Sequence, residues 1–232
     1  MEKKKIERAF FIHGRWPENK VKLKKNFICL GSEFCPKLIP AENEFKKALS
    51  YDPAGICLYT SFLSQKEFEE NTSFLNAILK RFPDTEVMIN DPGLLLWLNE
   101  NFPKVKKGIA RPLSVEFMRM PYEKLKIFMS ENKLSSLETD EADLLKNFPK
   151  KRSFSVYLRK EYVFSAMSRF CPFTRKISGN CLFECKKGKK IFSVPNSSVK
   201  MISYEKAYFT YAENIVGIFS ADRIVEDIFE KI

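Results

Sequence analysis

The chain has 232 residues, of which 44% are apolar and 30% are charged, and this is the composition of a soluble globular protein. The length is sufficient for one large domain or two small ones. No apolar run is long enough to span a membrane. The run AFFI at residues 9–12, which follows a basic N-terminal stretch, is also too short for a signal peptide. We therefore expect a cytoplasmic protein with no membrane span.

Basic residues outnumber acidic ones, 40 against 29, and the formal net charge is +11. Basic chains bind nucleic acid or anionic membranes more often than neutral chains do, so the charge leaves RNA open as a partner. The lysines are scattered over the whole chain, however, and such a composition also occurs without any nucleic-acid function. The six cysteines are expected to be free thiols or ligands in a reducing cytoplasm.

Short apolar runs alternate with amphipathic segments along the chain. The apolar runs predict strands at residues 9–14, 26–31, 55–63, 86–90, 107–113, 133–139, 153–167 and 214–220. The amphipathic segments predict helices at residues 43–50, 67–82, 92–102, 122–132, 141–148 and 222–232. Asp91 and Pro92 supply an N-cap and a first-turn proline to the third of these helices.

Repeated strand–helix units imply parallel strands, and about eight of them imply a (β/α)8 TIM-like barrel of the α/β class. Because the chain is short for this fold, we expect a compact barrel that is distorted or open. No linker or repeat divides the sequence, so we predict a single domain over residues 1–232.

Polar residues occur near the predicted carboxyl ends of several strands, where barrels bind their ligands. We take His13, Asn90, Arg111 and Glu138 as candidate substrate-binding residues. Arg111 is the best candidate for binding an anion, because a guanidinium can hold a carboxylate through two parallel hydrogen bonds. The alternative is that strand ends are polar simply because they are exposed to water.

Four cysteines form the most specific pattern in the sequence. Cys171, Cys181 and Cys185 lie in the basic segment FCPFTRKISGNCLFECKKGKK, and Cys35 lies far upstream in ICLGSEFCPK. Four thiolates, three local and one remote, suit a tetrahedral zinc site or an iron–sulfur cluster, and the two have the same formal charge.

The other two cysteines, Cys29 and Cys57, lie within the apolar runs FICL and GICLY. We therefore expect them to be small buried core residues. Reactive-thiol chemistry would need a base, and the single histidine of the chain is distant in sequence from the basic cysteine segment.

Three blocks of the sequence resemble the collagenase-like peptidase family and, within it, the UbiV-like group. The blocks are LGSEFCPK, INDPGLLLWLNENFPKVKKGIARPLS and VYLRKEYVFSAMSRFCPFTRKISGNCLFECKK. The resemblance covers about residues 6–225. It implies a cysteine-rich hairpin at residues 153–192 and a 4Fe–4S cluster held by Cys35, Cys171, Cys181 and Cys185.

The same resemblance implies a role in oxygen-independent hydroxylation of a quinone precursor, as a heterodimer with a second cluster protein of the UbiU type and with prephenate as the oxygen donor. Related members hydroxylate bases of tRNA or rRNA, so RNA modification is the alternative. A third alternative is a non-catalytic scaffold for a cluster, for electron transfer or for zinc. The sequence has no Ser/His/Asp or Cys/His pattern and no HExxH motif, so we do not expect peptidase activity.

Overall fold

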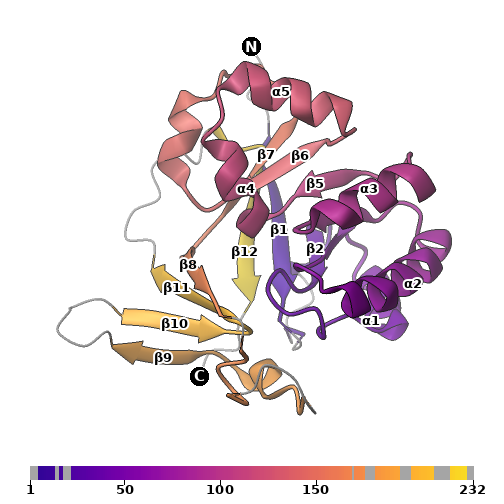
Figure 1. The fold of residues 1–232 in the computed structure, drawn as a ribbon, viewed down its shortest axis with the longest axis vertical. Helices are drawn as coiled ribbons and strands as arrows, with labels where there is room; N and C mark the ends of the chain where they lie inside the picture. Colours follow the sequence, from indigo (N-terminus) through magenta and orange to yellow (C-terminus); the bar gives the residue numbers. More distant parts are fainter. Residues whose placement is uncertain are drawn as a thin grey trace.

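The computed structural model describes residues 5–13, 16–17, 22–168, 170–175, 181–193, 200–211 and 220–228. Within this part of the chain, eight parallel strands form a closed barrel (Figure 1). The strands are β1 (Glu7–Ile12), β2 (Phe27–Gly31), β3 (Gly55–Tyr59), β4 (Glu86–Ile89), β5 (Lys107–Ile109), β6 (Ser136–Thr139), β7 (Ser155–Arg159) and β12 (Arg223–Ile228). Their order around the barrel is β1-β12-β7-β6-β5-β4-β3-β2. The predicted TIM-like barrel is confirmed, and it is closed rather than open.

Helices follow several of the strands and cover the outside of the barrel. They are α1 (Glu42–Leu49), α2 (Gln65–Arg81), α3 (Pro92–Asn101), α4 (Arg111–Met118), α5 (Tyr122–Glu131) and the 3-10 helix η2 (Ala142–Asn147). The predicted cap of α3 is confirmed, because the Asp91 side chain accepts a hydrogen bond from the backbone N–H of Leu94. Helix α4 differs from the sequence prediction, which extended the β5 strand to residue 113. In the described part of the chain, no helix has the length and apolar character needed to cross a membrane.

Alternate residues of the strands point to two different cores. Phe10 and Ile28 pack toward the helices in the larger apolar cluster. Phe11, Cys29 and Cys57 belong to a second cluster, which fills the inside of the barrel. Cys29 and Cys57 are partners in the register of β2 and β3 and are almost fully buried. The prediction that these two cysteines are core residues is confirmed.

A small antiparallel sheet lies beyond the carboxyl ends of β1 and β12 (Figure 1). It contains β8 (Tyr162–Met167), β9 (Lys190–Ser193), β10 (Lys200–Tyr204) and β11 (Ala207–Tyr211), in the order β8-β11-β10-β9. The predicted strand at residues 153–167 is therefore two strands, one in each sheet. The expected hairpin at residues 153–192 is also corrected, since β8 and β9 lie at opposite edges of the small sheet and pair with other strands.

The last strand of the barrel corrects another prediction. Residues 222–232 have apolar residues at helical spacing, but Arg223–Ile228 forms strand β12. This strand pairs in parallel with β1 and with β7, and it thereby closes the barrel. Pairing with two open strand edges outweighs the local helical pattern. The strand predicted at residues 214–220 falls almost entirely on residues outside the described part of the chain.

Candidate functional site

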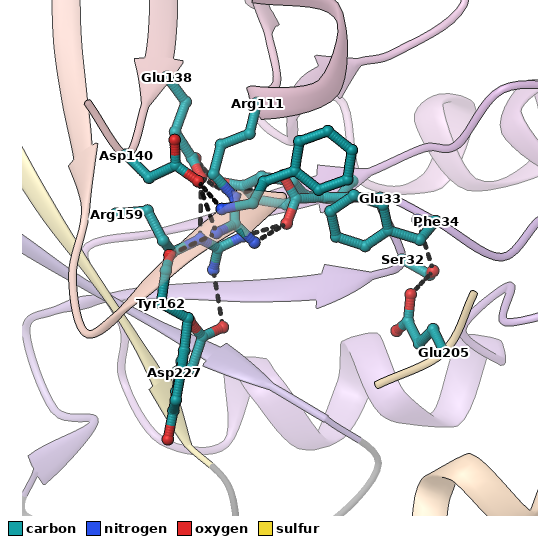
Figure 2. A network of polar contacts seen from close by, with 12 residues as sticks. Ser32, Glu33, Phe34, Arg111, Glu138, Asp140, Arg159, Tyr162, Glu205 and Asp227 are labelled. Atoms are coloured by element: carbon teal, nitrogen blue, oxygen red, sulfur yellow. Dashed lines mark hydrogen bonds and ion pairs between the residues drawn. The ribbon is translucent and has the colours of Figure 1, made fainter. Parts of the chain in front are cut away.

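The carboxyl ends of the barrel strands bring a set of charged residues together, as all strands run in the same direction. His13 follows β1, Glu33 follows β2, Arg111 begins α4 after β5, and Asp140 follows β6. Asp227 comes from the carboxyl half of β12. Figure 2 shows the carboxylates of Glu33, Asp140 and Asp227 converging on two arginines, Arg111 and Arg159, inside the rim of the barrel.

Arg111 is fully engaged by neighbouring groups of the protein. Its Nη2 and Nε atoms donate to the two carboxylate oxygens of Glu33, at 2.7 and 3.2 Å. Its Nη1 atom donates to Asp140 Oδ2 at 3.4 Å and to the backbone carbonyl of Tyr162 at 3.1 Å. The guanidinium therefore points into the rim, and an external carboxylate would have to compete with Glu33 for the same donors.

Arg159, the last residue of β7, lies deeper and has no exposed side-chain surface. Its nitrogens lie 2.6 Å from Glu33 Oε2, 2.9 Å from Glu138 Oε1 and 3.1 Å from Asp227 Oδ1. Asp227 Oδ1 also lies 2.7 Å from Nε2 of His13. One guanidinium thus holds three carboxylates, which come from the loop after β2, from β6 and from β12.

The environment moves the pKa values of these carboxyls in opposite directions. Burial opposes ionisation of Glu33 and Asp227, but the charges of Arg111 and Arg159 outweigh it and lower the pKa of both groups. For Glu138 burial outweighs Arg159 and raises the pKa to about 7. Glu138 can therefore gain or lose a proton near neutral pH while Glu33 stays ionised, and such a difference is typical of acid–base sites.

A small, partly open cavity lies between this network and the small sheet. Its volume of about 10 Å³ is enough for roughly one water molecule. The lining side chains are mostly aromatic or ionisable: Phe11, His13, Glu33, Phe34, Arg111, Tyr162, Ile202, Tyr204, Glu205, Phe209 and Asp227. The described lining residues include no Ser, Thr or Cys, the usual protein nucleophiles.

The structure brings three of the four candidate substrate-binding residues together. His13 and Arg111 line the cavity, and Oε1 of Glu138 lies 3.7 Å from Nε of Arg111. Asn90 has a different environment: its amide donates to the backbone carbonyl of Thr60 at 2.8 Å and accepts from the N–H of Leu113 at 3.3 Å. These bonds connect the loop after β3 to α4, and Asn90 is not a lining residue of the cavity.

Two of the four candidate metal-ligating cysteines are in contact with each other. Cys35, in the loop after β2, packs with Cys185, which lies in the 3-10 helix η3 (Glu184–Lys187). Cys171 and Cys181 are half-buried, and all four cysteines are free. Burial raises the pKa of Cys185 to about 12, and negative charge on Glu205 and on the other three thiols adds to the shift. Ionisation of any of the other three thiols therefore makes ionisation of Cys185 less favourable.

The backbone N–H of Phe183 donates a hydrogen bond to the sulfur of Cys181, two positions earlier in the chain, at 3.4 Å. Backbone N–H groups also favour the thiolate form of Cys35, from Lys37, and of Cys171, from Thr174 and Phe173. At Cys171 these groups and the Thr174 hydroxyl outweigh burial and lower the pKa. At Cys35 burial dominates, followed by the charge of Glu205, and the pKa is raised to about 11. Such N–H donors stabilise a thiolate, the form in which cysteine binds a metal.

A buried link connects the cysteines to the cavity. The Ser32 hydroxyl accepts the backbone N–H of Cys35 at 2.8 Å and that of Phe34 at 3.1 Å, and it donates to the carboxylate of Glu205. Glu205 lies in the turn between β10 and β11 and also lines the cavity. Burial raises its pKa to about 8. The small sheet thus contributes a carboxyl group to both parts of the site.

Within the described ranges, no group of three or more His, Cys, Asp or Glu side chains is arranged to hold a single metal ion. Sequence reasoning missed Arg159, Asp227, Ser32 and Glu205. For Asp227 the cause is the wrong helix at residues 222–232. A usable signal was present at the cysteines, because Cys35 and Cys171 both precede a proline, and the N–H of the residue after that proline favours the thiolate.

These features define a closed α/β barrel protein with a charged, partly aromatic site at the carboxyl ends of its strands. No family model matches the sequence, and no curated protein matches it either. Among solved structures, the chain is similar to that of the U32 peptidase Mk0906, with a TM-score of 0.56 and 10% sequence identity. The likeness covers 100% of this chain and 96% of that chain. At this identity it shows a shared fold.

Proposed function

We propose that the chain is an iron–sulfur protein of the collagenase-like peptidase family, in which Cys35, Cys171, Cys181 and Cys185 hold a 4Fe–4S cluster. The observation that carries the proposal is the packing of Cys35 against Cys185, together with backbone N–H groups that favour the thiolate forms of Cys35 and Cys171 and one that donates to the sulfur of Cys181 at 3.4 Å. Hydrogen bonds to the sulfurs are one of the means by which proteins tune such clusters. The likeness to a U32 peptidase structure supports the family assignment.

Four thiols are the donor type that this cofactor takes, but among the described residues no three of them surround a single point, so the cysteine segment would have to close around the cluster. Two of the thiols are buried and two are half-buried, so the cofactor would be shielded from solvent on one side. When bound, a 4Fe–4S cluster supplies one-electron chemistry or an iron site for an oxygen-bearing group. The neighbouring residues would orient a substrate: Arg111 and Glu33 fix the rim of the cavity, and Glu138, with a pKa of about 7, can hold or release a proton there.

We further propose that the activity is oxygen-independent hydroxylation of a quinone precursor, in a UbiV-like heterodimer with a UbiU-type partner. The aromatic lining of the cavity suits a planar, largely apolar substrate in kind. At about 10 Å³ the cavity has room for roughly one water molecule, so the small sheet would have to move away from the rim to admit such a substrate. A carboxylate donor such as prephenate would bind Arg111 by displacing Glu33, which now occupies two of its donors. RNA modification remains the second candidate, and the net charge of +11 favours it.

Peptidase activity is not part of this proposal. His13, the single histidine of the chain, is bonded to Asp227 and stacks on the ring of Phe11. The described lining of the cavity holds none of the hydroxyl or thiol nucleophiles on which triad hydrolases depend.

Anaerobic purification tests the cofactor. The protein should be brown and should contain about four irons per chain, and each of the variants Cys35→Ala, Cys171→Ala, Cys181→Ala and Cys185→Ala should lose iron. Cys29→Ala and Cys57→Ala are matched controls, since they remove buried thiols inside the barrel, and both should retain iron. Colourless protein with one tightly bound zinc would contradict the cluster but keep the site.

A gene deletion tests the activity independently of the cofactor. Mass spectrometry should show accumulation of an unhydroxylated quinone precursor in anaerobic cells and unchanged modified nucleosides. Complementation with the wild-type gene, but not with a Cys181→Ala variant, should restore the quinone. Loss of a hydroxylated nucleoside with normal quinones would instead support RNA modification.

A further inference from the structure

A second cavity lies at the opposite end of the barrel from the cysteines, outside the amino ends of β6, β7 and β12. Ser135 precedes β6, residues 150–155 lead into β7, and Asp222 precedes β12. The cavity has a volume of about 400 Å³, within the range of roughly 300–1,000 Å³ that is usual for small-molecule sites. Nothing in the proposed hydroxylation uses this end of the barrel.

Arg152 forms the base of this cavity, and its side chain is only 6% exposed. Its Nη2 atom donates to the carbonyl of Ser220 at 2.6 Å and to Asp222 Oδ2 at 3.0 Å, and its Nη1 atom donates to the carbonyl of Pro149 at 3.4 Å. The Nε atom is buried and has no hydrogen-bond partner among the described residues. A buried N–H group of a charged side chain is costly to leave unpaired. Because the Nε atom is covered, a ligand in the cavity would contact the exposed edge of Arg152 and would reach Nε only after the covering groups move.

The charge around the cavity is positive. Lys150, Lys151 and Arg152 line it, against the single carboxylate of Asp222. That carboxylate is already neutralised by Arg152 and accepts the backbone N–H of Val156 at 2.7 Å. Two positive charges therefore remain without an acidic partner in the lining. The lining also includes the hydroxyl groups of Ser153 and Ser155, which can donate hydrogen bonds, whereas the hydroxyl of Ser135 already donates to the carbonyl of Lys107 at 3.0 Å.

We propose that this cavity binds the phosphate group of a small phosphorylated molecule. A dianionic phosphate matches the two excess positive charges, and its oxygens can accept from the guanidinium, the two ammonium groups and the serine hydroxyls at once. The guanidinium is recessed, whereas contacts to an RNA backbone are made by side chains that stand out from a surface. The depth of Arg152 therefore favours a compact ligand that enters the cavity.

Isothermal titration calorimetry of the full chain tests this site, with ribose 5-phosphate as the probe and ribose and inorganic phosphate for comparison. Ribose 5-phosphate should bind, inorganic phosphate should compete with it, and ribose should not bind. The double variant Lys150→Ala/Lys151→Ala should weaken binding about tenfold or more, since charge-assisted hydrogen bonds are lost. Both lysines are exposed, so this variant should fold. Arg152→Ala would also break the contacts to Ser220 and Asp222, so Arg152→Lys is the better substitution there.

The matched control is Lys66→Ala/Lys80→Ala, which removes two exposed lysines from α2 and changes the net charge equally. It should leave the affinity for ribose 5-phosphate within about twofold. An equal loss in both double variants, or no binding by the wild-type protein, would overturn the proposal. So would binding of single-stranded RNA that depends on Lys150 and Lys151 without any binding of ribose 5-phosphate. Iron content and quinone levels report on the cysteine site alone. Failure of the phosphate-binding proposal is therefore distinguishable from failure of the proposed cluster and hydroxylation.

Discussion

The replacement of Arg159 by methionine is the most direct test of the charged network at the barrel rim. Methionine retains much of the length of the side chain but removes the charge and all of the hydrogen-bond donors. Three carboxylates within 3.1 Å of the guanidinium, those of Glu33, Glu138 and Asp227, then lose a shared partner. All three are almost fully buried, so water cannot replace the arginine without rearrangement of the barrel.

Removing one partner of a buried ion pair typically costs about 3–5 kcal/mol of unfolding free energy. Since three carboxylates are affected, we expect a loss of at least ~4 kcal/mol at pH 7.5, a large part of the ~5–15 kcal/mol that stabilises a typical domain. The loss should shrink at pH 5. In the wild type Arg159 helps to lower the pKa of Glu33 and Asp227, so their contribution to stability is present above the unfolded pKa of ~4 and is lost below it. Without Arg159, only Arg111 and His13 oppose the effect of burial on these two carboxyls, so their pKa values rise relative to the wild type, and the pKa of Glu138, which Arg159 also lowers, rises further. The variant therefore loses stability relative to the wild type as the pH rises from about 4 toward neutrality.

Urea unfolding followed by tryptophan fluorescence at pH 5 and 7.5 measures both effects. Arg159→Lys keeps one charge without the planar fork and should lose less stability than Arg159→Met. Arg81→Met is the matched control: Arg81 pairs with Glu42 on the surface, at 2.8 Å, and its loss should change stability by less than ~1 kcal/mol. A loss below ~1.5 kcal/mol for Arg159→Met, or one that is equal at the two pH values, would refute the role of this residue as the centre of the network.

Two further changes test other parts of the structure. Gly31→Ala should destabilise the protein by about 2–4 kcal/mol in the same assay, because Gly31 has φ +95° and an added Cβ would lie 2.2 Å from the carbonyl oxygen of Tyr59. Gly188→Ala, at φ +147° with no atom within 4 Å, should cost less, and equal losses would argue against the steric explanation. The wild-type Glu138 carboxyl, with a pKa of about 7, resists ionisation in the folded state, so the wild type should lose stability as the pH rises from about 4.5 to about 7. Glu138→Gln cannot ionise, so its stability relative to the wild type should increase over this pH range by up to ~3 kcal/mol. Parallel pH profiles of the two proteins would contradict the raised pKa.

The sequence predicts the barrel because its amphipathic helices are regularly separated by short apolar runs. Asp91 and Pro92 even mark the first turn of α3 correctly. Strand β12 was not predictable from local pattern, because its pairing with β1 and β7 depends on residues about 70 or more positions away. The charged network was hidden for the same reason: Arg159 and Asp227 are 68 residues apart in the chain.

The candidate cysteine ligands could be selected by sequence context, since Cys35 and Cys171 precede prolines whereas Cys29 and Cys57 lie in apolar runs. The sequence does not reveal that Glu205 and Ser32 connect these cysteines to the cavity. That contact joins residues 173 positions apart and depends on how the small sheet sits against the barrel.

The pairing of β1 with β12 has a consequence for the order in which this protein can fold. The two strands are the first and last of the barrel in sequence order. His13, which follows β1, and Asp227, which lies in β12, are 214 residues apart. During synthesis, a nascent chain that lacks β12 has two open strand edges, on β1 and β7, and its Arg159 has no Asp227 to bind. The rim site can therefore form only after β12 has left the ribosome. Until that moment the unpaired edges must be kept from pairing with other chains.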